Sequence, residues 1–139
     1  MLDREGHFWH DGERVDHRPL AQAMHGWIAR HPEDGRLILT NGYDWCYFRA
    51  EAAPFVVQSL SVEDAGVRLV LSDGSEELLD PATLGLDPGG VVQVRVKAGR
   101  FEASFSRHAQ TQLAPLLVSA DPPRLRIGDR EHPIAVRSV

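Results

Sequence analysis

The sequence predicts an α+β fold, in which a mostly antiparallel, curved β-sheet is covered by one long N-terminal helix and one shorter C-terminal helix. Three observations lead to this prediction. An apolar stripe with helical spacing runs through residues 20–28, short runs of β-forming residues fill residues 36–105, and Asp-Gly or Asn-Gly pairs separate several of these runs. Two-residue turns of this kind join antiparallel strands.

The long N-terminal helix is predicted to begin after Asp16 or His17, with Pro19 in its first turn, where a missing N–H costs nothing. Its apolar positions are three or four residues apart, which places them on one face. They are Leu20, Ala23, Met24, Trp27 and Ile28. Pro32 disfavours helical geometry at the residue before it, so the helix should stop at His31.

The remaining elements follow from alternation and turn residues. We expect four hairpins, centred on Asp11-Gly12, Asn41-Gly42, the segment 72–75 and the segment 98–100. The last of them pairs residues 92–97 with 101–106, which both alternate apolar and polar side chains. Residues 81–90 are predicted to form a loop. The shorter C-terminal helix is predicted over 107–118, with a kink or an early end at Pro115, and residues 124–136 add one or two short strands.

Length and composition predict a single folded domain over residues 1–139. The chain is 42% hydrophobic and 25% charged, which is ordinary for a globular protein, and no linker or repeat divides it. It lacks an apolar run long enough for a membrane span and an N-terminal secretory signal. Cys46 is the single cysteine, so no internal disulfide is possible. These features predict a cytoplasmic protein.

Charge is distributed unevenly. Residues 1–90 hold 7 Arg and 16 Asp or Glu, whereas residues 91–139 hold 8 Arg or Lys and 4 Asp or Glu. The basic C-terminal part could bind nucleic acid, but the net charge of −5 makes that function class unfavourable. Packing of the two parts against each other explains the asymmetry equally well.

The N-terminal histidines raise the hypothesis of a small metal-dependent hydrolase. His7, His10, Asp11 and His17 carry suitable ligand atoms. Zinc, however, needs three or four ligands that converge at about 2 Å, and residues three apart in a strand point to opposite faces. We therefore predict no metal site and no cofactor, and we keep the hydrolase as the alternative function.

Three further features have both a structural and a functional interpretation. Cys46 follows an aromatic residue in a strand and is predicted to be a buried core residue, as free cysteines usually are. Trp9 either packs across its hairpin against Arg14 or is an exposed aromatic residue for binding. Glu51 is either a solvated carboxylate or the inward partner of Arg95 or Arg107, in which case the three would form a polar site.

The sequence resembles an uncharacterised bacterial family, domain of unknown function 1285. The resemblance rests on four segments that follow one another along most of the chain: residues 9–12, residues 34–40, residues 51–56 and residues 101–107. Two positions depart from the family pattern as we expect it, since Ala52 stands where an acidic residue is expected and His17 where an arginine is expected. The resemblance implies a compact, mostly antiparallel α+β architecture, and it implies no activity.

The sequence does not assign a function. A non-catalytic binding or interaction module is the preferred interpretation, because no assembled catalytic pattern, phosphate loop or dinucleotide fingerprint is present. Its partner would be a small molecule or a protein, without a membrane, and a homo-oligomeric state is left open.

Overall fold

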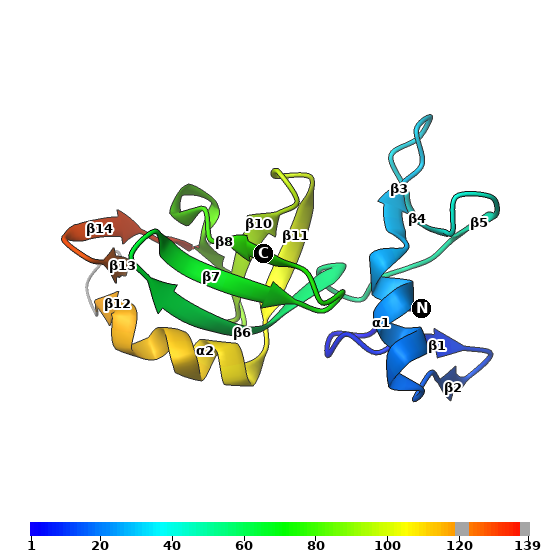
Figure 1. Cartoon of the computed structure of the whole chain (residues 1–139), viewed down its shortest axis with the longest axis horizontal. Coiled ribbons are helices and arrows are strands. Elements are labelled where there is room, and N and C mark those ends of the chain that lie inside the picture. The colour runs from blue at the N-terminus through cyan, green and yellow to red at the C-terminus, as the bar shows by residue number, and fades with distance from the viewer. Residues whose placement is uncertain (119–122, 137–139) are drawn as a thin grey trace.

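The computed structural model of the chain describes residues 1–118 and 123–136. Figure 1 shows two halves that lie side by side, with residues 1–47 in one and residues 55–136 in the other. The chain crosses between them once, through residues 48–54. The candidate site described below lies in the N-terminal half, so the elements of that half come first.

The N-terminal half contains a hairpin, a short helix and a three-stranded antiparallel sheet. The hairpin pairs β1 (Trp9–His10) with β2 (Glu13–Arg14), helix α1 spans Arg18–Gly26, and the sheet consists of β3 (Ile28–Arg30), β4 (Leu37–Thr40) and β5 (Trp45–Tyr47). The predicted turns at Asp11-Gly12 and Asn41-Gly42 are confirmed. Asp11, Gly12 and Gly42 have φ values of +50°, +80° and +96°, which explains the choice of residues that tolerate left-handed geometry.

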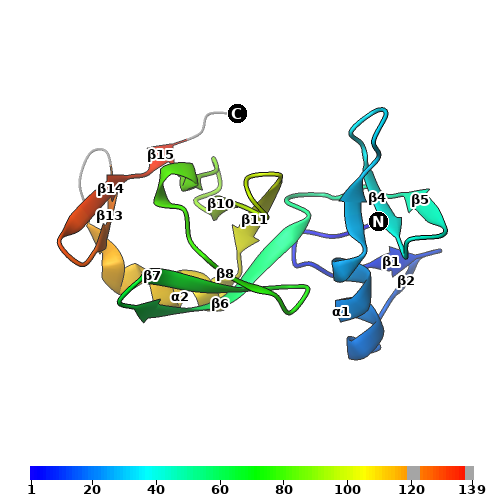
Figure 2. The ribbon, with the colours of Figure 1, turned by 45° about the horizontal axis from the view of Figure 1, so that its top comes forward.

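The C-terminal half is built on a seven-stranded sheet with the order β15-β9-β10-β11-β6-β7-β8. Its strands are β6 (Phe55–Glu63), β7 (Gly66–Leu71), β8 (Glu76–Leu78), β9 (Gly85–Leu86), β10 (Val92–Val96), β11 (Phe101–Phe105) and β15 (Ala135–Val136). Helix α2 (Arg107–Leu113) packs along β6, as Figure 2 shows. Two short 3-10 helices, η1 (Pro81–Thr83) and η2 (Ala114–Leu116), complete the connections.

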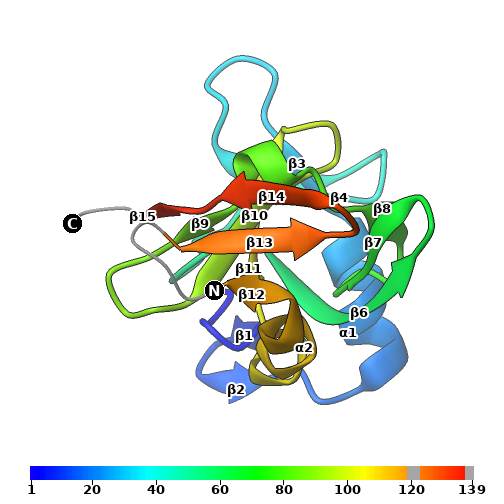
Figure 3. The same cartoon turned by 90° about the vertical axis from the view of Figure 1, so that its left-hand side faces the viewer.

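A smaller antiparallel sheet of three strands covers one end of this half. It contains β12 (Leu117–Val118), β13 (Arg124–Ile127) and β14 (Arg130–Pro133), which lie beyond the end of α2 in Figure 3. The tail was predicted to add one or two short strands, and it adds β13, β14 and β15. The predicted early end of the second helix is confirmed, because α2 ends at Leu113 and the chain continues through Pro115 as η2.

The predicted fold class is wrong in its helices. The molecule is mostly β-structure, and α1 has nine residues instead of forming one long helix. The apolar stripe runs on past Gly26, but the backbone leaves the helix there. Ile28 pairs with Leu39 in the three-stranded sheet, so strand pairing replaces the last helical turn. Glycine is the poorest helix former after proline, which makes this a favourable place to stop.

The predicted mostly antiparallel sheet also needs correction. The large sheet is mixed, because β11 pairs with β6 in parallel and β15 pairs with β9 in parallel. The first of these pairs arises because residues 55–63 and 101–105 meet across a long crossover rather than a hairpin. In addition, residues 81–90 are more than a loop, since they hold η1 and the short strand β9. The hairpin of β10 with β11 is present as predicted.

One hydrophobic core cluster draws on both halves. Leu2, Phe8 and Ile28 come from the N-terminal half and are buried together with side chains of β6, β7, β10, β11 and α2. Residues 49–51 pair with the first residues of the chain, since the N–H of Leu2 donates to the carbonyl of Arg49 and the N–H of Glu51 donates to the carbonyl of Leu2. Among the described residues, no helix combines the length and the apolar character that crossing a bilayer requires.

Candidate functional site

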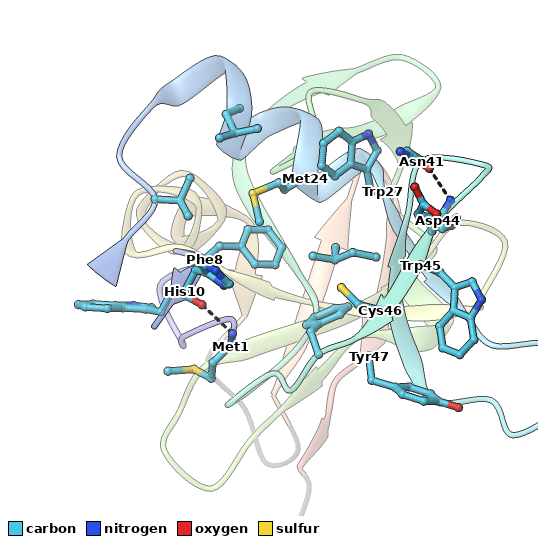
Figure 4. A pocket seen from close by; sticks show the side chains of 16 residues that line it. Met1, Phe8, His10, Met24, Trp27, Asn41, Asp44, Trp45, Cys46 and Tyr47 are labelled. Carbon is cyan, nitrogen blue, oxygen red and sulfur yellow. Dashed lines mark hydrogen bonds between the residues drawn. The ribbon is translucent and has the colours of Figure 1, made fainter. Parts of the chain in front are cut away.

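An open, mostly apolar cleft of about 540 Å³ lies within the N-terminal half, between α1, the β1–β2 hairpin and strands β4 and β5 (Figure 4). Its lining consists mostly of apolar side chains: Met1, Phe8, Trp9, Val15, Leu20, Met24, Trp27, Leu39, Trp45, Cys46, Tyr47 and Phe48. Four polar residues, His10, Thr40, Asn41 and Asp44, complete it. The cleft is therefore a hydrophobic surface with a few polar groups at its rim.

Helix α1 supplies one wall because of its residue spacing. Leu20, Met24 and Trp27 follow one another at intervals of four and three residues and so share a face. An apolar stripe with this spacing usually packs against a closed core. Instead, Met24 is half-buried, and Leu20 and Trp27 keep 43% and 37% of their surface exposed. The stripe faces a cleft that no other element of the described chain fills.

Strand β5 supplies the opposite wall. Leu39 pairs with Cys46, so these two side chains lie on the same face of the sheet, which is the face that borders the cleft. The prediction that Cys46 is buried is wrong, because its side chain is exposed at the cleft. Figure 4 shows its sulfur pointing into the space between Met24 and the strands. A strand whose faces both carry apolar residues gives no sequence signal for which face is covered.

An aromatic cluster holds β5 in place from the other side. The rings of Trp45 and Tyr47 meet edge to face at 5.1 Å, and the His31 ring lies 4.7 Å from Trp45. The hydroxyl of Tyr47 donates to Asp34 at 2.6 Å, and Arg36 lies over the Tyr47 ring at 4.0 Å. The bond between Tyr47 and Asp34 lowers the pKa of the Asp34 carboxyl and raises the pKa of the Tyr47 hydroxyl. These contacts tie β5 to the turn between β3 and β4.

The β1–β2 hairpin is anchored through Asp3. Its carboxylate accepts from the indole N–H of Trp9 at 2.8 Å and from the backbone N–H of His7 at 2.8 Å. Burial alone would raise the pKa of the Asp3 carboxyl, but the hydrogen bonds outweigh burial, so the pKa is lowered. Trp9 lies opposite Arg14, as the hairpin register predicted, and it also lines the cleft. Both interpretations of Trp9 from the sequence therefore describe part of its environment.

The polar end of the cleft is the turn between β4 and β5. The side-chain oxygen of Asn41 accepts from the backbone N–H groups of Tyr43 and Asp44, and the hydroxyl of Thr40 donates to the carbonyl of Asp44 at 3.0 Å. The amide oxygen of Asn41 and the hydroxyl of Thr40 are thus used to build the turn. The carboxylate of Asp44 makes no hydrogen bond or ion pair with the described part of the chain.

The histidines singled out in the sequence do not converge. His7 approaches Asp3 at 3.6 Å, and His10 approaches Asp11 at 3.3 Å in an exposed turn. The Nδ1 atom of His17 accepts from the N–H of Leu20 and caps α1. Within residues 1–118 and 123–136, no group of three His, Cys, Asp or Glu side chains has the arrangement of a metal site.

The proposed polar site around Glu51 is not formed. Glu51 is exposed, as are Arg95 and Arg107. The Arg95 guanidinium donates to the carbonyl of Gly99, and Arg107 borders a separate hollow with Arg4 near the start of α2. Glu51 has no ion pair with either arginine in the described chain. The solvated alternative is the one that the structure shows.

Sequence reasoning missed the cleft as a site, although one signal was present. All three tryptophans of the protein, Trp9, Trp27 and Trp45, lie in the first third of the chain and border this cleft. Each keeps between 37% and 50% of its surface exposed. Large aromatic residues concentrated on one exposed surface are typical of binding sites.

No protein-family model matches the chain, and no curated protein matches its sequence. Two crystal structures share its fold. The first is a DUF1285 family protein from Silicibacter pomeroyi DSS-3, with a TM-score of 0.76 and 19% identity over 96% of this chain and 78% of that one. The second is a DUF1285 family protein from Shewanella baltica OS155, with a TM-score of 0.65 and 14% identity over 82% of this chain and 88% of that one. The resemblance to domain of unknown function 1285 is therefore confirmed in the fold, and it assigns no function to this chain.

Proposed function

We propose that the protein is a binding module that takes a small, mostly apolar molecule into the cleft of its N-terminal half. The observation that carries this proposal is the cleft itself, with its tryptophan-rich apolar lining and a few polar groups at its rim. Its volume of about 540 Å³ falls within the range of small-molecule sites, roughly 300–1,000 Å³. Such sites combine an apolar lining with a few polar groups that orient the ligand.

The energetic argument is that this surface costs stability unless something covers it. Leu20, Trp27 and Trp45 each leave more than a third of their surface in water, and all three border the cleft. Burial of apolar surface stabilises by about 25 cal/mol per Å². A ligand that covers the cleft gains this energy without a large rearrangement, because the Tyr47 and Asp3 contacts already hold the walls. An apolar segment of a protein partner would use the same surface, and it is the rival occupant.

The first prediction uses a neutral aromatic probe, 1-naphthalenemethanol, followed by the intrinsic fluorescence of the tryptophans. Since all three tryptophans border the cleft, binding should change the emission in a saturable manner. Alkylation of Cys46, the single cysteine, with N-ethylmaleimide places a bulky group in the cleft. We expect the affinity for the probe to fall at least about tenfold, which corresponds to about 1.4 kcal/mol.

The matched control moves the alkylation away from the cleft. In a Cys46→Ser, Val62→Cys variant the thiol lies on β6 at a position whose native side chain is 58% exposed, so alkylation there should leave probe affinity unchanged. Melting temperatures before and after alkylation confirm that each form is folded. Lack of saturable binding to the unmodified protein contradicts the small-molecule proposal, and so does equal affinity before and after alkylation of Cys46.

A further inference from the structure

We infer that the ligand of this cleft carries a positive charge, which is bound at the carboxylate of Asp44 beside Trp27. This inference rests on the proposed function, because it names the class of molecule that the same cleft would take. The class is an amphipathic cation: an apolar, preferably aromatic body with an ammonium group at one end.

The first argument is the charge of the lining. Among the side chains that border the cleft, Asp44 is the single carboxylate, and none is an arginine or a lysine. An organic anion would therefore enter an apolar cleft without a cationic side chain to receive it. His10, the one histidine among the residues that line the cleft, already faces Asp11 at 3.3 Å. The ammonium group of Met1 donates to the carbonyl of Trp9 at 2.9 Å and lies across the cleft from Asp44 (Figure 4).

The second argument is the freedom of the Asp44 carboxylate. The backbone N–H and C=O of this residue hold the β4–β5 turn through Asn41 and Thr40. Its side chain takes no part in that turn and has no partner in the described chain, so the backbone of Asp44 is held in place while its carboxylate stays available. Figure 4 shows Asp44 and Asn41 together at the end of the cleft, next to the indole of Trp27.

The third argument is the aromatic surface beside the carboxylate. The face of an indole ring attracts a cation, and tryptophan does so better than tyrosine or phenylalanine. A carboxylate next to an exposed tryptophan at the end of an apolar cleft therefore provides two attractions for an ammonium group while the ligand's body covers the apolar walls. Both attractions are modest at an exposed site, so we expect a preference of about fivefold rather than a strict requirement.

The experiment compares three probes with the same naphthalene body: 1-naphthylmethylamine, which is cationic at about pH 7, neutral 1-naphthalenemethanol and anionic 1-naphthaleneacetate. Binding is measured by tryptophan fluorescence at low ionic strength, because salt screens an exposed charge. The amine should bind about fivefold more tightly than the alcohol, and the acetate more weakly than both. In Asp44→Asn the amine should lose this preference while the affinity for the alcohol stays the same.

The matched control is Asp64→Asn, which changes the net charge by the same amount at an exposed position between β6 and β7, outside the cleft. It should keep the preference for the amine, since the whole-molecule charge of −5 attracts cations only in a general way. If the alcohol does not bind, the proposed function fails. If the alcohol binds but the amine binds no better, or if both variants reduce the preference equally, the assignment to Asp44 is overturned.

Discussion

At the scale of single residues, the most unusual side chain is that of His25. It lies on the face of α1 that turns away from the cleft and is only 4% exposed. Its Nε2 atom donates to the carbonyl of Gly6 at 2.8 Å, whereas its Nδ1 atom is buried with no partner in the described chain. The Phe8 ring packs against it at 4.8 Å. A second proton would have no acceptor, so burial in this environment favours the neutral form of His25.

This environment predicts a loss of stability in mild acid. Burial lowers the pKa of His25 below its ordinary value of 6.5, although the Gly6 carbonyl and the charge of Asp73 act against it. The unfolded chain therefore binds a proton more readily than the folded one. Above about pH 6.5, His25 should contribute no pH dependence to the free energy of unfolding. As the pH falls from 6.5 towards the lowered pKa, the free energy of unfolding should decrease, because the unfolded chain takes up the proton first.

Urea melts between about pH 5 and pH 8 test this expectation. His25→Gln keeps a donor for Gly6 but cannot titrate, so its stability should depend less on pH in this window than that of the native protein. His108→Gln on α2 is the control, because that side chain is exposed and should leave the pH dependence unchanged. The carboxyl of Asp73 does not interfere, since its pKa is lowered from 3.8 and its effect falls at lower pH. If the stability of the native protein and of both variants depended on pH in the same way, the assignment of this pH dependence to His25 would be contradicted.

At the scale of elements, the sequence was most informative where one residue type determines local geometry. The Asp11-Gly12 and Asn41-Gly42 turns have the positive φ values that these residues tolerate, and Pro115 ends α2 because it lacks an N–H. The end of α1 was missed for the opposite reason. Apolar spacing alone cannot show that Ile28 will pair with Leu39 instead of continuing the helix, because that pairing depends on a partner strand eleven residues away.

Apart from the grouping of the tryptophans, the sequence gives little indication of the candidate site, because the site is a space between elements. Its walls come from the N-terminal hairpin, α1 and the β4–β5 hairpin, and nothing local tells that they stand apart. The spacing of Leu20, Met24 and Trp27 is the same whether the helix packs against a closed core or borders an open cleft. The exposure of Cys46 and of Glu51 depends in the same way on which elements pack beside them in the fold.

A second element-scale feature is the contact of two hairpins through Lys97, the single lysine. Its ammonium group donates to Asp73 and to the hydroxyl of Ser75, both at 2.7 Å, and lies 5.4 Å from the centre of the Phe55 ring. Asp73 is nearly buried, and although burial alone would raise its pKa, the bonds from Lys97 and Ser75 lower it. The β7–β8 turn is thereby tied to the β10–β11 turn.

Replacement of Lys97 should therefore cost stability. Lys97→Met keeps the aliphatic stem but leaves the Asp73 carboxylate without its cation, and we expect a loss of about 2 kcal/mol, typical of hydrogen bonds to charged groups. Arg95→Met, at an exposed position of β10 two residues before Lys97, should change stability by no more than about 0.5 kcal/mol. A double-mutant cycle with Asp73→Asn measures the coupling of the pair. A coupling energy near zero would show that the two turns are held together by other contacts.

At the scale of the whole molecule, the two halves meet through several close contacts. Gly6 has a φ of +87° and its Cα lies so near Val56 that a methyl group there would collide with it. Gly74, in the β7–β8 turn, is approached even more closely by the side chain of Gln22 from α1. Leu2 is fully buried and pairs with Phe8 of the N-terminal half and with Ala50 of the crossing segment. The two halves are therefore in direct contact at this junction.

The last prediction is that the chain unfolds in one cooperative transition, as a single domain of fewer than about 150 residues should. The two halves offer separate signals: tryptophan fluorescence reports only on the N-terminal half, which holds Trp9, Trp27 and Trp45, whereas far-ultraviolet circular dichroism reports mainly on the large sheet of the C-terminal half. Because Leu2, Phe8 and Ile28 belong to the same core cluster as that sheet, opening of one half exposes part of the core of the other. The two probes should therefore give the same denaturant midpoint. Two separate midpoints would show that the crossing at residues 48–54 joins two domains.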